Sequence, residues 1–454
     1  MNRTGLGKYR RTDCAFPSRP LVAASIEGIE QAVVIPALAE RDSLFRTLAC
    51  LARNPEGDLR RTMVICVVNN HRPSIAGDAD ILVNREALAL LHALVFRLPG
   101  APGLPEGVER DIRLTSASAL RLAYIDASSG GVEIPDRDGG VGTARKIGMD
   151  AALQVIGANE ANGGVIGCLD ADTLVEENYL SAIWNHLNSG AHPASVTGYA
   201  HQKPGDPALL AAICCYEIFL RAYVIGLAHA GSPYAFHSIG STMCCTSAAY
   251  AAVRGMNRRP AAEDFHFLNK LAKIGPIGVL SATTVFPSPR PSKRVPFGTG
   301  QRMNRFLAGG TDEYRLYDPR IFEILKRWLA LMATGADRDP DSILRDAGSI
   351  HGELAAYLRM CRFVETWRLI RQNSRDPGQL RRQFQTWFDG LKTLRLVHHL
   401  SRSTFSPVPM FDAVNGHVPL AGRPFGLAGA CGGVPDPDEQ YRMLTALRAA
   451  YPFS

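Results

Sequence analysis

The chain has 454 residues, of which 46% are hydrophobic and 20% charged, and its formal net charge at pH 7 is +7. This composition is typical of a globular protein with a large core and two or three domains, and a charge this mild, without a dense Lys/Arg run, argues against a nucleic-acid partner. The ten cysteines contain no Cys-x-x-Cys pair, which argues against a zinc site or a disulfide framework and favours a reducing compartment.

Targeting signals are weak. The basic N-terminus lacks the apolar core of a signal peptide, and the most apolar long segment, 208–230, carries Glu217 and Arg221 near its middle. A charge at a bilayer centre costs roughly 2.5–3.5 kcal/mol on insertion scales, so this segment is expected to be a buried or amphipathic helix. We therefore expect a cytoplasmic protein without a transmembrane segment, for which peripheral contact with a membrane stays open.

Up to about residue 300, β-rich runs alternate with helical patterns. The expected strands are 31–37, 61–70, 121–127, 163–172, 194–202, 237–247 and 276–289. The expected helices are 41–53, 85–96, 143–157, 176–188, 208–230 and 263–275. This alternation predicts an α/β fold in which helices cover both faces of a mostly parallel sheet.

A Pro-, Gly- and Lys/Arg-rich loop at 287–303 follows, and from about 315 the pattern is helical. The candidate helices there are 314–334, 351–372 and 380–400. The expected organisation is an N-terminal extension (1–30), an α/β domain (31–305) and a helical C-terminal region with a Pro/Gly-rich tail (306–454).

Polar side chains gather where the expected strands end, and ligands of parallel sheets bind at that edge. These residues are Glu40, Asn69, Asn70, Asp126, Asp170 and Asp172. The Asp-x-Asp spacing of the last two occurs at five other places in the chain, so the spacing alone is uninformative. Asp170 and Asp172 differ from those five pairs because they follow a strand-like apolar run.

Two carboxylates that leave a strand together can hold Mg²⁺ or Mn²⁺, whose other ligands come from a diphosphate and water. Capping of a helix that starts near Val175 explains the pair equally well. Arg145 and Lys146 lie at an expected helix start, where cations oppose the helix dipole, which suggests an anionic ligand or a salt bridge.

Two further groups of charged residues can be explained either by a purely structural role or by a functional one. Glu263 and Asp264 open a helix, and acids in a first turn complement the helix dipole without any further role. The loop cations form either a solvated turn or a lid that closes over phosphates. They are Arg290, Lys293, Arg294 and Arg302.

Taken in order and approximate spacing, a set of segments resembles the family 2 glycosyltransferases with the GT-A fold, over roughly residues 30–300. The segments are IPALAE, VVNN, GTARK, CLDADT, GSTMCCTSAAYAAVRGM and AEDFHFLNKL. The resemblance implies that Asp170 binds the ribose of a nucleotide-sugar donor and that Asp172 binds Mg²⁺ or Mn²⁺ on its diphosphate. It also implies that Asp264 is the general base toward the acceptor hydroxyl, and it matches Arg145 to the arginine of an Ala-Arg-Asn-like element.

The chain departs from the family pattern at two strands. The first-strand motif keeps Pro36 and Glu40 but lacks the usual aromatic residue and amide, and the second strand ends in Asn69-Asn70-His71 instead of Asp-Asp-Gly-Ser. Asn70 is expected to face the base, whose identity stays open. The residues expected to bind the donor are Pro36, Glu40, Asn70, Arg145, Asp170, Arg294 and Arg302, with Asp172 as the metal ligand.

The expected function is that of a metal-dependent, hexosyltransferase-like enzyme. It would move a sugar with inversion from a nucleotide diphosphate to a hydroxyl of a saccharide, lipid-linked or small-molecule acceptor. Two alternatives stay open. A sugar-1-phosphate nucleotidyltransferase is expected to have a Gly-rich, basic loop directly after the first strand, and the segment IPALAERDS lacks such a loop. A non-catalytic nucleotide-sugar or glycan-binding protein would keep the pocket without a working base.

Overall fold

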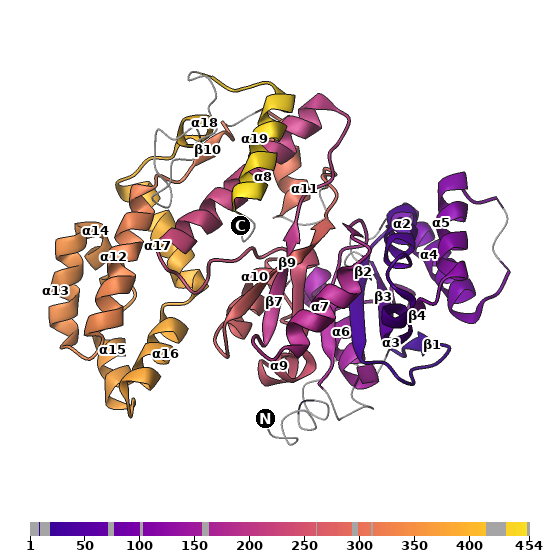
Figure 1. The fold of residues 1–454 in the computed structure, drawn as a ribbon, viewed down its shortest axis with the longest axis horizontal. Helices are drawn as coiled ribbons and strands as arrows, with labels where there is room; N and C mark the ends of the chain where they lie inside the picture. The colour runs from indigo at the N-terminus through magenta and orange to yellow at the C-terminus, as the bar shows by residue number, and fades with distance from the viewer. Residues whose placement is uncertain are drawn as a thin grey trace. The chain divides into compact units, whose positions relative to one another are not determined.

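A computed structural model describes residues 9, 19–70, 77–99, 103–156, 163–259, 261–292, 298–309, 312–414 and 433–451. The chain divides into two compact units (Figure 1). The first runs to residue 203 and resumes at 238–304, and the second comprises 204–237 and the chain from 305. The end of the first unit lies beside the expected boundary at 305, but residues 204–237, which we expected within the α/β domain, belong to the second unit.

The first unit is built on one mixed sheet of nine strands in the order β1-β4-β3-β2-β5-β8-β7-β9-β6. The strands are β1 Val22–Ala23, β2 Gln31–Ala37, β3 Thr62–Asn69, β4 Arg121–Ala127, β5 Val165–Cys168, β6 Leu174–Val175, β7 Ala194–Tyr199, β8 Met243–Thr246 and β9 Ile277–Phe286. The four strands β4, β3, β2 and β5 run parallel, whereas β8 is antiparallel to β5 and to β7. The α/β class is confirmed, and the parallel part of the sheet is the part that carries the Asp-x-Asp pair.

Alternate residues of the central strands face opposite layers of helices. On one side, Val33 and Ile35 of β2 join a buried cluster with residues of α2 (Arg41–Leu51), α4 (Asp78–Phe96), α5 (Glu106–Ala117) and α7 (Tyr179–Asn188). In Figure 1, α2, α4 and α5 lie beside β2, β3 and β4. Burial of both strand faces explains why these strands read as continuous apolar runs in the sequence.

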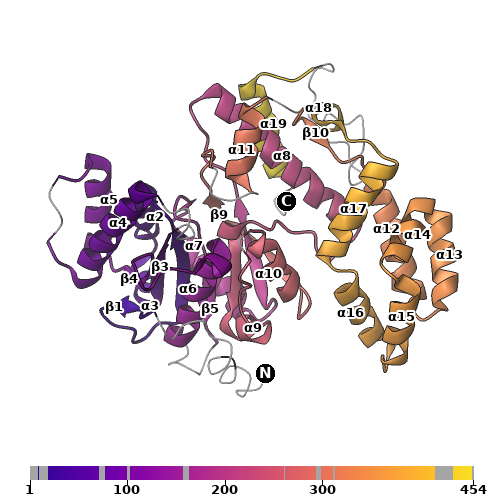
Figure 2. The ribbon, with the colours of Figure 1, turned by 180° about the vertical axis from the view of Figure 1, so that it is seen from behind.

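Helix α6 (Val141–Ile156) covers the other side of the central strands, as the view from behind in Figure 2 lets the reader follow. Gly148 lies in the middle of this helix, and a Cβ atom added there would come within 2.3 Å of Val34 Cγ1. Only glycine permits so close an approach of the helix to the strand. The tight packing fixes the first turn of α6, and with it Arg145, near the carboxyl end of β5.

The second unit is helical. Its helices are α8 Pro207–His229, α12 Arg320–Gly335, α13 Pro340–Ile350, α14 Gly352–Met360, α15 Phe363–Gln372, α16 Pro377–Trp387, α17 Gly390–Ser403, α18 Met410–Asp412 and α19 Pro437–Ala450. A two-stranded ladder joins β10 (Arg315–Leu316) to β11 (Val408–Pro409). Trp328, Phe363 and Trp367 are fully buried in its core, where Phe363 stacks on Trp367 and meets Trp328 edge to face.

The sequence predicts two long helices in this unit, at 351–372 and 380–400, and each prediction is wrong because the segment forms two helices. The segment 351–372 forms α14 and α15, which are separated at Arg362, where φ is +53°. The segment 380–400 forms α16 and α17, and Asp389 begins the second helix because its carboxylate accepts a hydrogen bond from the Lys392 amide at 3.1 Å. Apolar periodicity continues across both breaks, so it does not reveal them.

Helix α8 contains the most apolar segment of the chain. Among the described residues it is the one helix long and apolar enough to cross a membrane, and 67% of its most apolar window is buried inside the protein. Its Glu217 is fully buried and pairs with Arg221 of α8 and with Arg448 of α19. Length and apolar composition are weak evidence for a span when the charged residues are paired inside the protein in this way.

Several boundaries in the first unit differ from the expected ones. The strand expected at 237–247 is reduced to β8, because Gly240–Thr242 forms a short 3-10 turn before it. Helix α5 lies between the expected helix 85–96 and the expected strand 121–127, where no element was expected. Three more short helices complete the unit: α3 Glu56–Arg61, α9 Ser247–Ala252 and α10 Glu263–Leu271. Helix α11 (Thr299–Leu307) spans the boundary between the two units.

Candidate functional site

Asp170 lies two residues after the end of β5, and both of its carboxylate oxygens are bound. Arg145 Nη2 donates to Oδ1 at 2.5 Å, and Ser241 Oγ donates to Oδ2 at 2.6 Å. The Asp170 amide in turn lies 3.3 Å from Ser241 Oγ. The carboxylate is therefore held in one orientation at the edge of the sheet where ligands bind.

Arg145 is the buried centre of this arrangement, with only 3% of its side chain exposed. Besides Asp170 it binds Glu263 Oε1 through Nε at 3.1 Å and the Gly240 carbonyl through Nη1 at 3.0 Å. Burial alone would lower the pKa of the guanidinium, but the carboxylates of Asp170 and Glu263 outweigh it and raise that pKa. Of the two explanations for a cation at this helix start, the salt bridge is the one the structure contains.

Asp172 lies two residues further on, beside a second arginine. Arg290 Nη2 contacts Glu40 Oε1 closely and lies 3.4 Å from Asp172 Oδ2. Burial raises the pKa of Asp172 to about 7, together with repulsion from Asp170 and Glu40 and against the attraction of Arg290. Because burial and neighbouring carboxylates destabilise the charged form of Asp172, a further cation close to it would stabilise that charged form.

Glu263 and Asp264 open α10 and have different environments. The Glu263 carboxylate is 5% exposed and is held by Arg145, whereas Asp264 Oδ1 accepts a hydrogen bond from the Phe265 amide at 2.7 Å. Ala262, which precedes them, has φ +56° in the left-handed region. Burial and the neighbouring Glu263 raise the pKa of Asp264 to about 7. Asp264 is thus a carboxyl group that exchanges its proton near neutral pH.

The remaining expected donor-binding residues occupy different positions. Asn70 follows β3, where its amide donates to the Ser128 carbonyl at 2.6 Å and its oxygen accepts from Asn84. Pro36 is a buried residue of β2, in register with Val67. Arg302 lies in α11, and Arg294 falls outside the described residues. Donor contacts of these four residues stay predictions.

The structure brings together Arg145, Asp170 and Glu263 in one cluster and Glu40, Asp172 and Arg290 in a second, joined by the short link from Asp170 to Asp172. The sequence patterns do not predict a role for Ser241, for Glu263 as a counter-ion, or for Arg290 as a partner of Glu40. Each of these contacts joins residues more than sixty positions apart. Only the segment resemblance around GST at 240–242 pointed toward one of them.

The donor set at the second cluster suits a hard divalent cation. Within the described part of the chain, no group of three or more His, Cys, Asp or Glu side chains could hold a metal by itself. Mg²⁺ is commonly bound through one or two carboxylates, with phosphate and water as its other ligands. Asp172, with Glu40 beside it, matches that kind of site and not a cage made by the protein alone.

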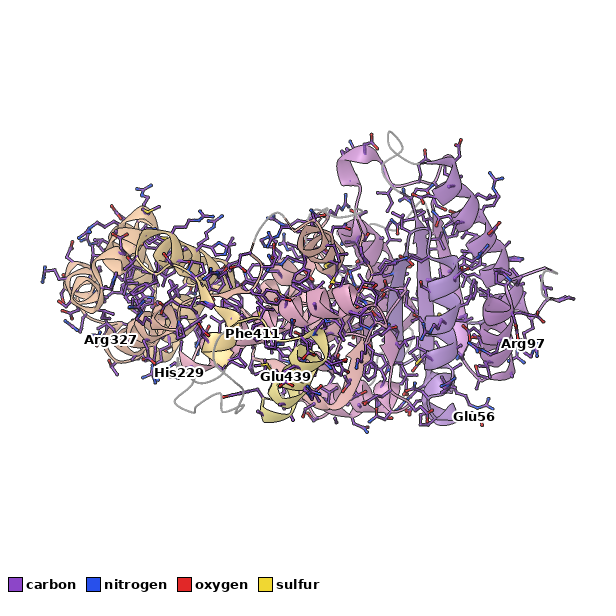
Figure 3. The ribbon with its side chains drawn as sticks, turned by 90° about the horizontal axis from the view of Figure 1, so that it is seen from above. Glu56, Arg97, His229, Arg327, Phe411 and Glu439 are labelled. Carbon is purple, nitrogen blue, oxygen red and sulfur yellow. The ribbon has the colours of Figure 1, made fainter. Side chains whose placement is uncertain are left out.

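A cavity of about 700 Å³ lies elsewhere in the first unit. Its lining includes Glu56 and Arg97, which Figure 3 labels, and residues 117–121. Residues 117–120 directly precede β4, and Glu56 belongs to α3, which directly precedes β3. The cavity therefore lies at the amino ends of the parallel strands, opposite to the edge that carries Asp170 and Asp172.

Comparison with known proteins yields distant structural likenesses only. No protein-family model and no curated protein matches the chain. Among solved structures, S. aureus TarS 1-349 in complex with UDP-GlcNAc is 12% identical, with a TM-score of 0.37 over 82% of this chain and 92% of that one. The mannosyltransferase PcManGT from Pyrobaculum calidifontis, in complex with GDP-Man and Mn²⁺, is 14% identical, with a TM-score of 0.35 over 84% and 92%. At such TM-scores the likeness assigns neither an activity nor a ligand to this chain.

Proposed function

We propose that the chain is a metal-dependent, inverting glycosyltransferase of the family 2, GT-A type, with a nucleotide diphosphate sugar as its donor. One observation carries the proposal: Asp170 and Asp172 follow a parallel strand, and Arg145 pairs Asp170 with Glu263, the neighbour of Asp264, whose pKa is raised to about 7. Carboxylates suited to a cation and a carboxylate suited to proton transfer are what sugar transfer from a diphosphate to a hydroxyl requires.

The donor end of the site is the Asp-x-Asp pair. Asp170, held by Arg145 and Ser241, keeps lone pairs with which its oxygens accept hydrogen bonds from a ribose. Asp172 is the residue that would bind Mg²⁺ or Mn²⁺. A divalent cation there would neutralise charge on the diphosphate and so make it a better leaving group.

The acceptor end is Asp264. The Glu263 carboxylate forms an ion pair with Arg145. Asp264 is therefore the carboxylate of the two that can take the proton of an acceptor hydroxyl. A single displacement by that hydroxyl requires no covalent intermediate on the protein and inverts the anomeric carbon. Saccharide, lipid-linked and small-molecule acceptors all carry such a hydroxyl.

We further propose a cytoplasmic location. Within the described ranges, Cys50, Cys66, Cys168, Cys215, Cys244, Cys245 and Cys361 form no disulfide, which agrees with a reducing compartment.

The test is identification of the products released from a panel of donors. UDP-GlcNAc and GDP-mannose, the donors in the two solved structures named above, are the first to use, each with Mn²⁺. A glycosyltransferase releases the nucleoside diphosphate when an acceptor is present. Release of pyrophosphate from a nucleoside triphosphate and a sugar-1-phosphate would establish the nucleotidyltransferase alternative. Binding of a donor without turnover on any acceptor would favour a binding protein.

The rate should depend on pH through Asp264. Its pKa is raised to about 7, so the base form required for proton transfer is present above that pH and is lost as the pH falls through it. With donor and Mn²⁺ saturating, kcat/KM for the acceptor should rise with pH to a plateau above about 7. A rate that falls over the same range as the pH rises would contradict the assignment of Asp264 as base.

A further inference from the structure

Arg290 lies between the two carboxylates that a cation would approach. It follows β9, and its guanidinium contacts Glu40, at the start of α2, together with Asp172, after β5. Within the part of the chain that the structure describes, Arg290 thus supplies a positive charge at the carboxylate that the proposed function assigns to a metal ion.

The two arginines of the site differ in how firmly they are held. Arg145 is 3% exposed and is bound by two carboxylates and a carbonyl. Arg290 is 41% exposed, and its Nη2 is a long 3.4 Å from Asp172. Ion pairs that reach solvent change an equilibrium constant by no more than about fivefold, so the contact between Arg290 and Asp172 is easily broken. Arg145 is a fixed part of the site, whereas Arg290 can be displaced.

We propose that Arg290 is a positioning residue: it acts as a resident counter-ion for Asp172 and Glu40, and it yields Asp172 only when a divalent cation arrives together with a diphosphate. The proposal rests on the proposed function. A cation that enters alone must displace the guanidinium from Asp172, and the released guanidinium then finds no new anionic partner. A cation that enters with a diphosphate brings new anionic oxygens, to which the released guanidinium can bind with charge-assisted hydrogen bonds.

A coupling between the two ligands follows from this exchange. The diphosphate should raise the affinity for the cation, and by thermodynamic reciprocity the cation should raise the affinity for the diphosphate equally. Arg290 carries part of that coupling, because it opposes the cation in the absence of the diphosphate and binds the diphosphate in its presence. The residue therefore prevents the site from filling with free metal ion.

The experiment is a titration of Mn²⁺ without nucleotide, followed by the electron paramagnetic resonance signal of the free ion. Arg290→Gln should bind Mn²⁺ more tightly than the wild type, by up to about fivefold, the factor that corresponds to an ion pair that reaches solvent. Arg290→Lys keeps the positive charge and should stay close to the wild type. Arg46→Gln removes the same charge from an exposed position of α2 and should leave the affinity unchanged.

A second titration adds UDP or GDP. In the wild type the nucleotide should tighten Mn²⁺ binding, and in Arg290→Gln this tightening should be smaller. Equal Mn²⁺ affinities of the wild type and Arg290→Gln without nucleotide would overturn the counter-ion role and leave the proposed function intact. Failure of the wild type to bind Mn²⁺ with either nucleotide would instead count against the proposed function. Thermal unfolding of each variant checks that it is folded.

Discussion

Asp264→Asn is expected to reduce kcat by about 10²–10⁴-fold, which is the usual contribution of general-base catalysis. The amide that replaces the carboxylate cannot accept the acceptor's proton, while the shape of the side chain is nearly unchanged. Asp264 accepts a hydrogen bond from the Phe265 amide at the start of its own helix, so the affinity for donor with Mn²⁺ should stay the same. Turnover and calorimetric titration of the donor, carried out on one preparation, measure the two effects separately.

Glu263→Gln is the matched control, because it changes the neighbouring carboxylate in the same chemical way. Its carboxylate is buried against Arg145, so its loss should appear first in the free energy of unfolding. Near-normal turnover of Asp264→Asn would refute the base assignment. So would a loss of donor binding in Asp264→Asn as complete as the loss expected for Asp172→Asn, since the residue would then act on the donor and not on the acceptor.

Arg145→Met should lower the free energy of unfolding by about 3–5 kcal/mol, the range observed when one partner of a buried ion pair is removed. The buried carboxylate of Glu263 would be left without its guanidinium, and Asp170 would lose the donor at its Oδ1. Donor binding should fall as well, because Asp170 is then free to turn. Urea unfolding reports the first effect and calorimetry the second.

The double variant Arg145→Met/Glu263→Leu separates the two roles of this arginine. Removal of both charges leaves no buried carboxylate unpaired at Glu263, and replacement of a buried pair by apolar residues is often neutral or stabilising. Much of the lost stability should return, while donor binding stays weak because Asp170 still lacks its partner. A double variant that recovers both properties would make Arg145 purely structural. Arg46→Met, on the surface of α2, should alter neither property.

The central strands could be predicted from the sequence, and the reason is their burial. Residues 31–37 and 121–127 form β2 and β4 with the predicted bounds. Both are apolar runs bounded by turn-forming or polar residues, so their pattern depends on local sequence alone. Helix α6 was likewise predicted within two residues of its observed bounds, Val141–Ile156.

The contacts of the site could be predicted only in part. The apolar run directly before Asp170 and Asp172 predicts a strand, so their position at a strand end follows from the local sequence. The pairing of Arg145 with Glu263 joins positions 118 residues apart, and that of Arg290 with Glu40 joins positions 250 apart. No local pattern encodes which charges meet when the sheet assembles, so an anionic ligand and a salt bridge were equally good explanations of Arg145.

The division into units was predicted incompletely for a similar reason. Helix α8 lies between two segments of the first unit in sequence, so order along the chain assigned it to the α/β domain. Its buried Glu217 pairs with Arg448, 231 residues further on, and this pairing ties it to α19 of the helical unit. The partner of a buried charge is a property of the folded chain and not of the segment that carries it.

The measurement closest to the central claim is calorimetric titration of UDP and GDP, with Mn²⁺ and with a chelator, into the wild type and Asp172→Asn. The wild type is expected to bind at least one of the two nucleotides in a manner that requires Mn²⁺. Asp172→Asn should lose that binding, because a neutral amide replaces the anionic ligand of a hard cation. Glu177→Gln, which removes an exposed carboxylate five positions on, should retain it. Equal binding with Mn²⁺ and with the chelator, or equal losses in Asp172→Asn and Glu177→Gln, would contradict a donor site built on the strand-end pair.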